Sequence, residues 1–136
     1  MHGYAARVRT AVLLNLVVLV PTGIYTKFYA GPLQHWVANS LGGVFYELFW
    51  CLAALAMVPR IDGRVTAGIV FGVTSLLEFL QLWHPAWLEA IRGTFLGAAL
   101  LGSTFVWSDF AYYVVGSVLG WWAIASIKSE CARTAA

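Results

Sequence analysis

Four long apolar stretches dominate this sequence, and they restrict the chain to very few folds. They cover residues 11–29, 41–58, 65–83 and 107–127, with charged or turn-forming residues between them. A helix needs about 20 predominantly apolar residues to cross the hydrocarbon core of a bilayer. Backbone polar groups inside lipid must also find hydrogen bonds within their own segment. The stretches therefore predict four membrane-spanning helices.

The composition excludes a soluble globular domain. The 136 residues are 61% hydrophobic and only 10% charged, with a mean hydropathy of +0.79. A soluble domain carries about 25% charged residues, so lipid must cover most of this surface. The net charge of +2 is too small to argue for a nucleic-acid partner. We predict an all-α, polytopic membrane helix bundle that forms a single domain over residues 1–136.

The region between the third and fourth stretches decides between four spans and five. Its uncharged part begins at Gly93 and has about 14 residues, a length that favours a short re-entrant or interfacial helix. Basic residues agree with four spans, because six of them then share one side of the membrane with both termini. These six are Arg7, Arg9, Arg60, Arg64, Lys128 and Arg133. The positive-inside rule then places both termini in the cytoplasm, with five spans as the alternative.

Glycines spaced four residues apart occur in three of the helical segments. The pairs are Gly68/Gly72, Gly93/Gly97 and Gly116/Gly120. Small residues at this spacing allow membrane helices to approach closely. The pattern predicts tight packing in a compact bundle.

Ionisable residues within membrane spans are costly and need partners. In the four-span arrangement Glu47, Glu78, Arg92 and Asp109 all lie towards the outer side. An arginine can bridge two carboxylates with its forked donors. We therefore predict a polar network in which Arg92 joins Glu78 to Asp109.

Two further polar residues extend this network, and a third carboxyl group lies near it. Gln81 is three residues after Glu78 and shares its helix face, and Tyr113 lies one turn after Asp109. Glu47 is expected to face the same cavity or to stay protonated there. The network either fixes the helix register or binds a ligand, and the sequence does not choose between these roles.

The end of the third span carries the interfacial residues Trp83, His84 and Trp87. Tryptophan gathers at the boundary between lipid and water, so we expect Trp83 and Trp87 to form an interfacial wall of the cavity. The sequence offers no metal-ligand spacing, no CxxC pair, no phosphate-binding loop and no Ser-His-Asp order. We therefore expect no metal and no cofactor, and enzyme activity is disfavoured.

Several motifs resemble known membrane families. The order Glu78, Gln81, Arg92, Asp109, Tyr113, Gly116, Gly120 resembles the VanZ-like proteins, although Tyr113 stands where those usually have Asn. The segments FYELFWCL, LEFLQLWHPAWLEAIRGTFLGAALLG and FVWSDFAYYVVGSVLGW resemble a bacterial family of small four-span proteins of unknown function. The resemblance implies a compact helix bundle in the bacterial inner membrane. VanZ is associated with reduced susceptibility to teicoplanin, so it also implies an envelope or lipid-linked role.

Three functions follow as hypotheses. The first is binding of a membrane lipid or lipid-linked envelope component in a polar cavity near the outer leaflet. The second is an accessory or structural subunit of a larger membrane complex, with partner subunits packed on the small-residue faces. The third, less favoured, is a proton-linked carrier that uses Glu47 or Glu78.

Overall fold

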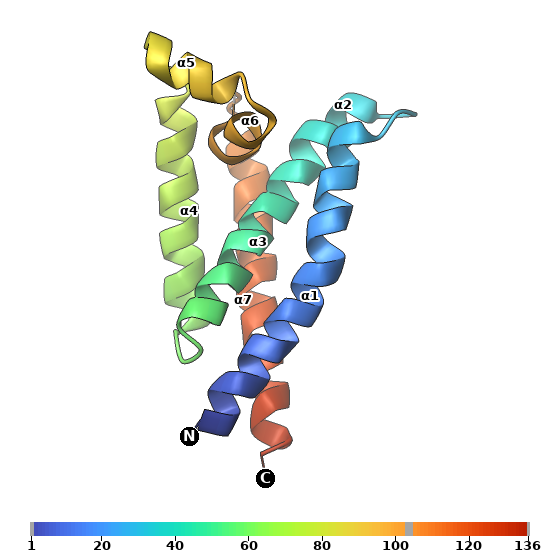
Figure 1. Cartoon of the computed structure of the whole chain (residues 1–136), viewed down its shortest axis with the longest axis vertical. Coiled ribbons are helices and arrows are strands. Elements are labelled where there is room, and N and C mark those ends of the chain that lie inside the picture. Colours follow the sequence, from blue (N-terminus) through green and yellow to red (C-terminus); the bar gives the residue numbers. More distant parts are fainter. Residues whose placement is uncertain (1, 103–104, 136) are drawn as a thin grey trace.

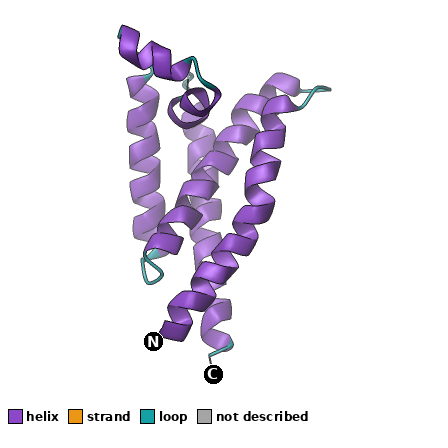
Figure 2. Cartoon of the chain, in the orientation of Figure 1, coloured by secondary structure: helices purple, strands orange, loops and turns teal. Residues whose placement is uncertain are grey.

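The structure is a computed structural model that describes residues 2–102 and 105–135, and this part of the chain is helical with short connections (Figure 2). A short π-helical turn, Val37–Leu41, joins the helices before and after it without a break. The elements are α1 (His2–Phe28), α2 (Gln34–Trp36), the π turn (Val37–Leu41), α3 (Gly42–Met57), α4 (Gly63–Leu80), α5 (Ala86–Arg92), α6 (Phe95–Leu101) and α7 (Asp109–Arg133).

Four helical segments among the described residues are long and apolar enough to cross a membrane. They are Gly3–Phe28, Gln34–Met57, Gly63–Leu80 and Asp109–Arg133. This confirms the all-α membrane bundle and supports four spans. The first, second and fourth helices extend beyond the predicted apolar stretches, because a helix can continue into polar residues outside the hydrocarbon. Pro21 lies inside α1 without ending it.

Both termini lie at one end of the bundle, together with the turn between α3 and α4 (Figure 1). We call this the terminal end and the other the α5–α6 end. α7 packs against α3 and α4, while α1 packs mainly against α3. At the far end, α5 crosses the end of α4 and α6 folds in beside it (Figure 1).

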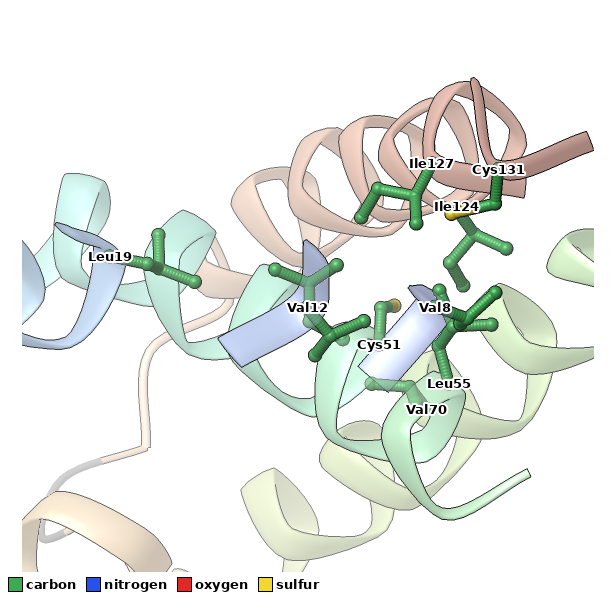
Figure 3. Close-up of a cluster of buried hydrophobic side chains, with 10 residues drawn as sticks. Val8, Val12, Leu19, Cys51, Leu55, Val70, Ile124, Ile127 and Cys131 are labelled. Carbon is green, nitrogen blue, oxygen red and sulfur yellow. The ribbon is translucent and has the colours of Figure 1, made fainter. Parts of the chain in front are cut away.

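A dry apolar core fills the terminal end. Figure 3 shows side chains of α1, α3, α4 and α7 converging there. Val8, Val12, Cys51, Leu55 and Ile124 have no exposed surface at all. Burying a side chain of this size contributes roughly 1.5–3 kcal/mol in water. In lipid, where tails are as apolar as leucine, close packing supplies the gain instead.

Two glycines bring α7 into close contact with α3. A Cβ atom on Gly116 would lie 2.5 Å from the Cβ atom of Glu47, and one on Gly120 would lie 2.5 Å from Cys51 Sγ. The predicted tight packing is therefore confirmed for this pair. It is wrong for Gly68 and Gly72, since a Cβ atom there would meet nothing within 4 Å in the described part of the chain.

At the terminal end of the bundle, charged side chains hydrogen-bond to the backbone groups at the ends of α3 and α4. Asp62 caps α4, because its carboxylate accepts hydrogen bonds from the backbone N–H groups of Arg64 at 2.8 Å and Val65 at 3.3 Å. These bonds lower the pKa of the exposed Asp62 carboxyl below its usual value. Arg9 donates to the Ala56 carbonyl of α3 at 3.0 Å. Such contacts stabilise the short turn between α3 and α4.

The connection between α4 and α7 holds two short helices where the sequence predicted one. α5 and α6 have seven residues each, far below the roughly 20 needed to cross a bilayer. Thr94 separates them, and its hydroxyl accepts a hydrogen bond from Gly97 N at 3.0 Å, which caps α6. Gly97 also packs against the Ile91 carbonyl of α5, so this glycine serves a tight local turn.

Candidate functional site

A polar cavity of about 300 Å³ lies at the α5–α6 end of the bundle. The four spanning helices and α6 all contribute to its walls. The lining residues with polar side chains are Lys27, Asn39, Tyr46, Thr74, Gln81, Asp109 and Tyr113. Ligand cavities usually occupy about 300–1,000 Å³, so this one suits a small polar group and not a whole lipid.

Glu78 lies just behind the cavity wall and is 1% exposed. Its Oε2 atom accepts hydrogen bonds from the Tyr113 hydroxyl at 2.9 Å and from Gln81 Nε2 at 3.2 Å. Its Oε1 atom accepts one from the Val106 backbone N–H at 3.1 Å. A carboxylate only accepts hydrogen bonds, and all three neighbours donate. The polar pair that interrupts the third span thus joins α4 to α7 and to the segment before it.

The side-chain orientation of Gln81 follows from its partners. Its Nε2 atom donates both to Glu78 and to the Leu101 carbonyl of α6, at 3.1 Å. Since both partners are acceptors, the amide nitrogen must face them. The Gln81 Oε1 atom is then buried, and it has no hydrogen-bond partner among the described residues. Among those residues it is an unpartnered acceptor on a cavity-lining side chain.

Asp109 brings a second carboxyl group to the site from the first turn of α7. Tyr113, one turn further along α7, also lines the cavity and donates to Glu78, so the two carboxyl groups belong to the same site. Lys27, from the last turn of α1, is the cation that lines this cavity. With Glu78 counted behind the wall, the site therefore has two carboxyl groups and one lysine.

The π turn shapes the mouth of the cavity. Lys27 Nζ donates to the Ala38 carbonyl inside this turn at 2.7 Å, and Asn39 of the same turn lines the cavity. Single π turns widen a helix and occur often at functional sites. Here the turn brings a lysine of α1 and an amide of the second span to one place.

The C-terminal end of α6 closes the cavity from above. The Tyr46 hydroxyl of α3 donates to the Leu100 carbonyl at 2.5 Å, while Gln81 holds the next carbonyl. Gly102 follows with φ of +72°, a conformation that favours glycine. The cap therefore depends on hydrogen bonds from two different spans.

The predicted bridge from Arg92 to Glu78 and Asp109 is not formed in the described part of the chain. Arg92 is only 5% exposed, but its guanidinium donates to the carbonyls of Leu80 and Trp83, both at 2.8 Å, and pairs with Glu89 at 2.7 Å. It thus caps the last carbonyls of α4, a favourable place for a cation. Glu89, one turn earlier on α5, is therefore the ion-pair partner of Arg92 that the sequence predicted Glu78 to be.

Glu47 does not line the cavity, contrary to expectation. It is completely buried at the contact between α3 and α7. Its Oε2 atom accepts a hydrogen bond from the Ser117 hydroxyl at 2.8 Å, and Oε1 has no partner among the described residues. The close approach of Gly116 turns this side chain into the helix interface. Glu47 and Glu78 therefore occupy two separate environments.

The interfacial residues lie outside the cavity, at the junction of α4 and α5. Trp83 and Trp87 are more than half exposed and pack edge to face, with ring centroids 5.6 Å apart. They form an exposed surface and not a cavity wall. His84 Nδ1 lies 3.0 Å from Glu89 Oε1. Hydrogen bonds from His84 and Arg92 lower the pKa of the exposed Glu89 carboxyl.

Four polar residues that line the cavity are absent from the predicted set: Lys27, Asn39, Tyr46 and Thr74. Lys27 carried a signal, since it is one of only two basic residues placed away from the termini in the four-span arrangement. Asn39 and Tyr46 carried little sequence signal, because they come to line one cavity only through the π turn and the way α6 folds back against the spanning helices. No group of three His, Cys, Asp or Glu side chains comes together in residues 2–102 and 105–135 to hold a metal ion.

Comparison with known proteins gives a family but no activity. No solved structure matches the chain. The sequence model of a family described as "Protein of unknown function (DUF2809)" matches residues 32–117. The match includes the π turn, α3, α4, both short helices and the start of α7, which hold all of the cavity except Lys27. The chain, with four helices long and apolar enough to span a membrane among its described residues, therefore belongs to the DUF2809 family, whose function is unknown.

Proposed function

We propose that this protein binds the head group of a membrane lipid, or of a lipid-linked envelope component, in the cavity beneath α6. It does so in the bacterial inner membrane, with both termini in the cytoplasm and the cavity near the outer leaflet. The observation that carries this proposal is the placement of polar groups around Glu78. Polar side chains inside a membrane bundle are costly, yet four helices contribute them to one cavity.

The orientation rests on the distribution of charge between the two ends of the bundle. Arg60 and Arg64 lie in or next to the turn between α3 and α4, and Arg9 and Lys128 donate to carbonyls at that turn, those of Ala56 and Ile61. The turn lies at the terminal end (Figure 1). Basic residues remain on the cytoplasmic side during insertion. The cavity then opens towards the outer half of the bilayer, where the resemblance to VanZ-like proteins also suggests an envelope role.

The two short helices fit this orientation. Trp87 at the start of α5 packs against Trp83 in the connection before it, and this pair suits the boundary between lipid and water. α6 is a re-entrant segment in this proposal, and its C-terminal carbonyls form the cap of the cavity. Backbone that is not in a spanning helix is tolerated at this depth where protein buries it or where it lines a cavity.

Lipid retention tests the proposal. The full chain is purified in mild detergent from bacterial membranes, and bound lipid is counted by native mass spectrometry. We expect retained lipid in the wild type and its loss in Ala98→Phe, which fills the cavity. Ala125→Phe, on an exposed face of α7, serves as the matched control and retains lipid. Equal lipid in all three proteins would rule out the cavity as the binding site.

A second candidate function is that of an accessory subunit, favoured by the exposed face of α4. Gly68 and Gly72 lie on it, and a Cβ atom added to either would meet no described atom within 4 Å. A small-residue face of this kind lets another helix approach closely. We expect a stoichiometric partner in a mild-detergent pull-down of the wild type, lost in Gly72→Leu and kept in Val73→Leu. Recovery of the chain alone contradicts this function.

A further inference from the structure

We propose that the cavity selects a head group that carries a primary ammonium beside a phosphate, as in a phosphoethanolamine. This inference rests on the proposed function and names its ligand class. Three features carry it: the surplus of acidic groups, the available acceptor of Gln81, and the position of the single lysine in the cavity wall.

The acidic surplus favours a cationic ligand. Asp109 lines the cavity, and Glu78 lies behind the wall, where the lining residues Gln81 and Tyr113 hydrogen-bond to it. Lys27 is the cation that lines the cavity. Like charges at short distance destabilise each other, and a nearby opposite charge relieves this. Arg92, which could have supplied that charge, is held by the carbonyls of Leu80 and Trp83 and by Glu89. A ligand cation can therefore supply the positive charge near Asp109 that Arg92 does not.

The hydrogen-bonding groups favour N–H donors. Gln81 Oε1 is buried, its side chain lines the cavity, and this oxygen has no partner among the described residues. Its orientation cannot reverse without turning the amide nitrogen away from both Glu78 and Leu101. A primary ammonium has three N–H donors, which match this oxygen and the Asp109 carboxylate. A trimethylammonium group has none.

The lysine accommodates the anionic part of the same head group. Lys27 Nζ gives one hydrogen bond within the described part of the chain, to Ala38, and an ammonium has three donors. The remaining donors can bind a phosphate oxygen at the mouth formed by the π turn. A zwitterionic head group can pair its ammonium with Asp109 and Gln81 and its phosphate with Lys27.

A methylation series tests this inference without altering the protein. Delipidated wild type in dodecyl maltoside is titrated with dioleoyl phosphatidylethanolamine, its N-methyl and N,N-dimethyl derivatives, and dioleoyl phosphatidylcholine. Each added methyl group removes a donor while the charge stays the same. We expect affinity to fall along the series, by at least about tenfold from the first lipid to the last. Dioleoyl phosphatidylglycerol is expected to bind no better than phosphatidylcholine.

One variant and one soluble ligand complete the test. Asp109→Asn is expected to flatten the methylation series, whereas Glu89→Gln, at the same end but outside the cavity, leaves it unchanged. Soluble O-phosphoethanolamine is used as a competitor at the same concentration as the lipid. If it displaces the lipid equally well, ammonium recognition stands and the lipid source is overturned.

The remaining outcomes separate the two proposals. Equal affinity for phosphatidylethanolamine and phosphatidylcholine, with lipid still lost in Ala98→Phe, overturns the ammonium preference and leaves lipid binding intact. A preference that survives in Asp109→Asn overturns the assigned site. No lipid bound by the wild type at any concentration overturns the proposed function itself.

Discussion

The two ends of this bundle are built from the same spanning helices, yet their interiors differ. At the terminal end, Val8, Leu55 and Ile124 meet in a dry core. At the α5–α6 end, polar side chains of α1, α3, α4 and α7 surround a cavity. The difference arises at the contact positions. Glycines let α7 close onto α3, whereas larger polar side chains such as Tyr46 and Tyr113 reach across a gap to form hydrogen bonds.

The comparison also separates the two buried glutamates. Glu47 is part of the close helix contact and accepts one hydrogen bond, from Ser117. Glu78 borders the cavity and has three. A polar group inside a membrane protein thus takes its role from the packing around it, since the side chains are chemically identical.

The largest effect is expected from closing the α3–α7 contact with a larger side chain. Gly116→Leu would force its Cβ atom against Glu47 and the Val44 carbonyl, and we expect a loss of about 3 kcal/mol in the free energy of unfolding. Gly72→Leu, where no described atom lies within 4 Å, is the matched control and should change stability by less than about 0.5 kcal/mol. SDS titration followed by circular dichroism measures both. Equal losses would contradict the tight contact.

The second prediction compares the two glutamates directly. In Glu78→Gln the new amide nitrogen must face a donor, whichever way it turns, because both carboxylate oxygens accept bonds. We expect a loss of about 2 kcal/mol, measured as the shift in thermal unfolding in detergent. Glu47→Gln can keep its oxygen towards Ser117 and turn its nitrogen to the side where Oε1 has no described partner, so it should lose less than about 1 kcal/mol. A carrier role for Glu78 predicts the reverse, with transport lost and stability unchanged.

The third prediction concerns one hydroxyl group of the cavity. Tyr113→Phe removes the 2.9 Å hydrogen bond to Glu78 and should cost about 1 kcal/mol. Tyr112→Phe is the neighbouring control, since its hydroxyl accepts a bond from Trp36 Nε1 at the rim. Chemical unfolding followed by tryptophan fluorescence should show a loss below about 0.5 kcal/mol for the control. A larger loss in Tyr112→Phe than in Tyr113→Phe would place the important hydroxyl at the rim.

The smallest effect is expected from acid at the α5–α6 end. The Glu89 pKa is lowered by its bonds with His84 and Arg92, so its stabilising contribution is present above the ordinary glutamate pKa of about 4.3. It is lost as the pH falls below that value and through the lowered pKa. Unfolding temperatures measured between about pH 6 and pH 3 should therefore fall less steeply in Glu89→Gln. Glu130→Gln, at the terminal end beside Arg133, is the control, and an identical pH profile in both variants would remove this role for Glu89.

Much of the fold could be predicted because hydrophobic length alone defines spanning helices. The four stretches, and the tight Gly116/Gly120 contact, correspond to the structure. The two short helices between 86 and 101 were merged into one, since neither is long enough for a clear apolar pattern. The pairing of Glu78 with Gln81 was predictable from their spacing on one helix face.

The ion-pair partner of Arg92 could not be predicted from the sequence. Arg92 was matched with Glu78 because it was a cation near the carboxylates along the chain. Because the chain turns between the end of α4 and Pro85, α5 lies across the end of α4 (Figure 1), and Arg92 instead reaches Leu80, Trp83 and Glu89. The partner of a side chain on a short helix depends on the direction in which that helix folds back. Here that direction pairs Arg92 with Glu89 instead of Glu78.

The sequence by itself determined that this chain is a membrane-spanning helix bundle and that its third span carries an inward-facing polar pair. Apolar length and helical periodicity are local properties, so the order of residues is enough to define them. Only the tertiary structure decided that Glu78 borders a cavity with Asp109 and Lys27, while Glu47 is enclosed against Gly116. Those placements depend on how closely helices approach, which is set by contacts between residues far apart in the chain.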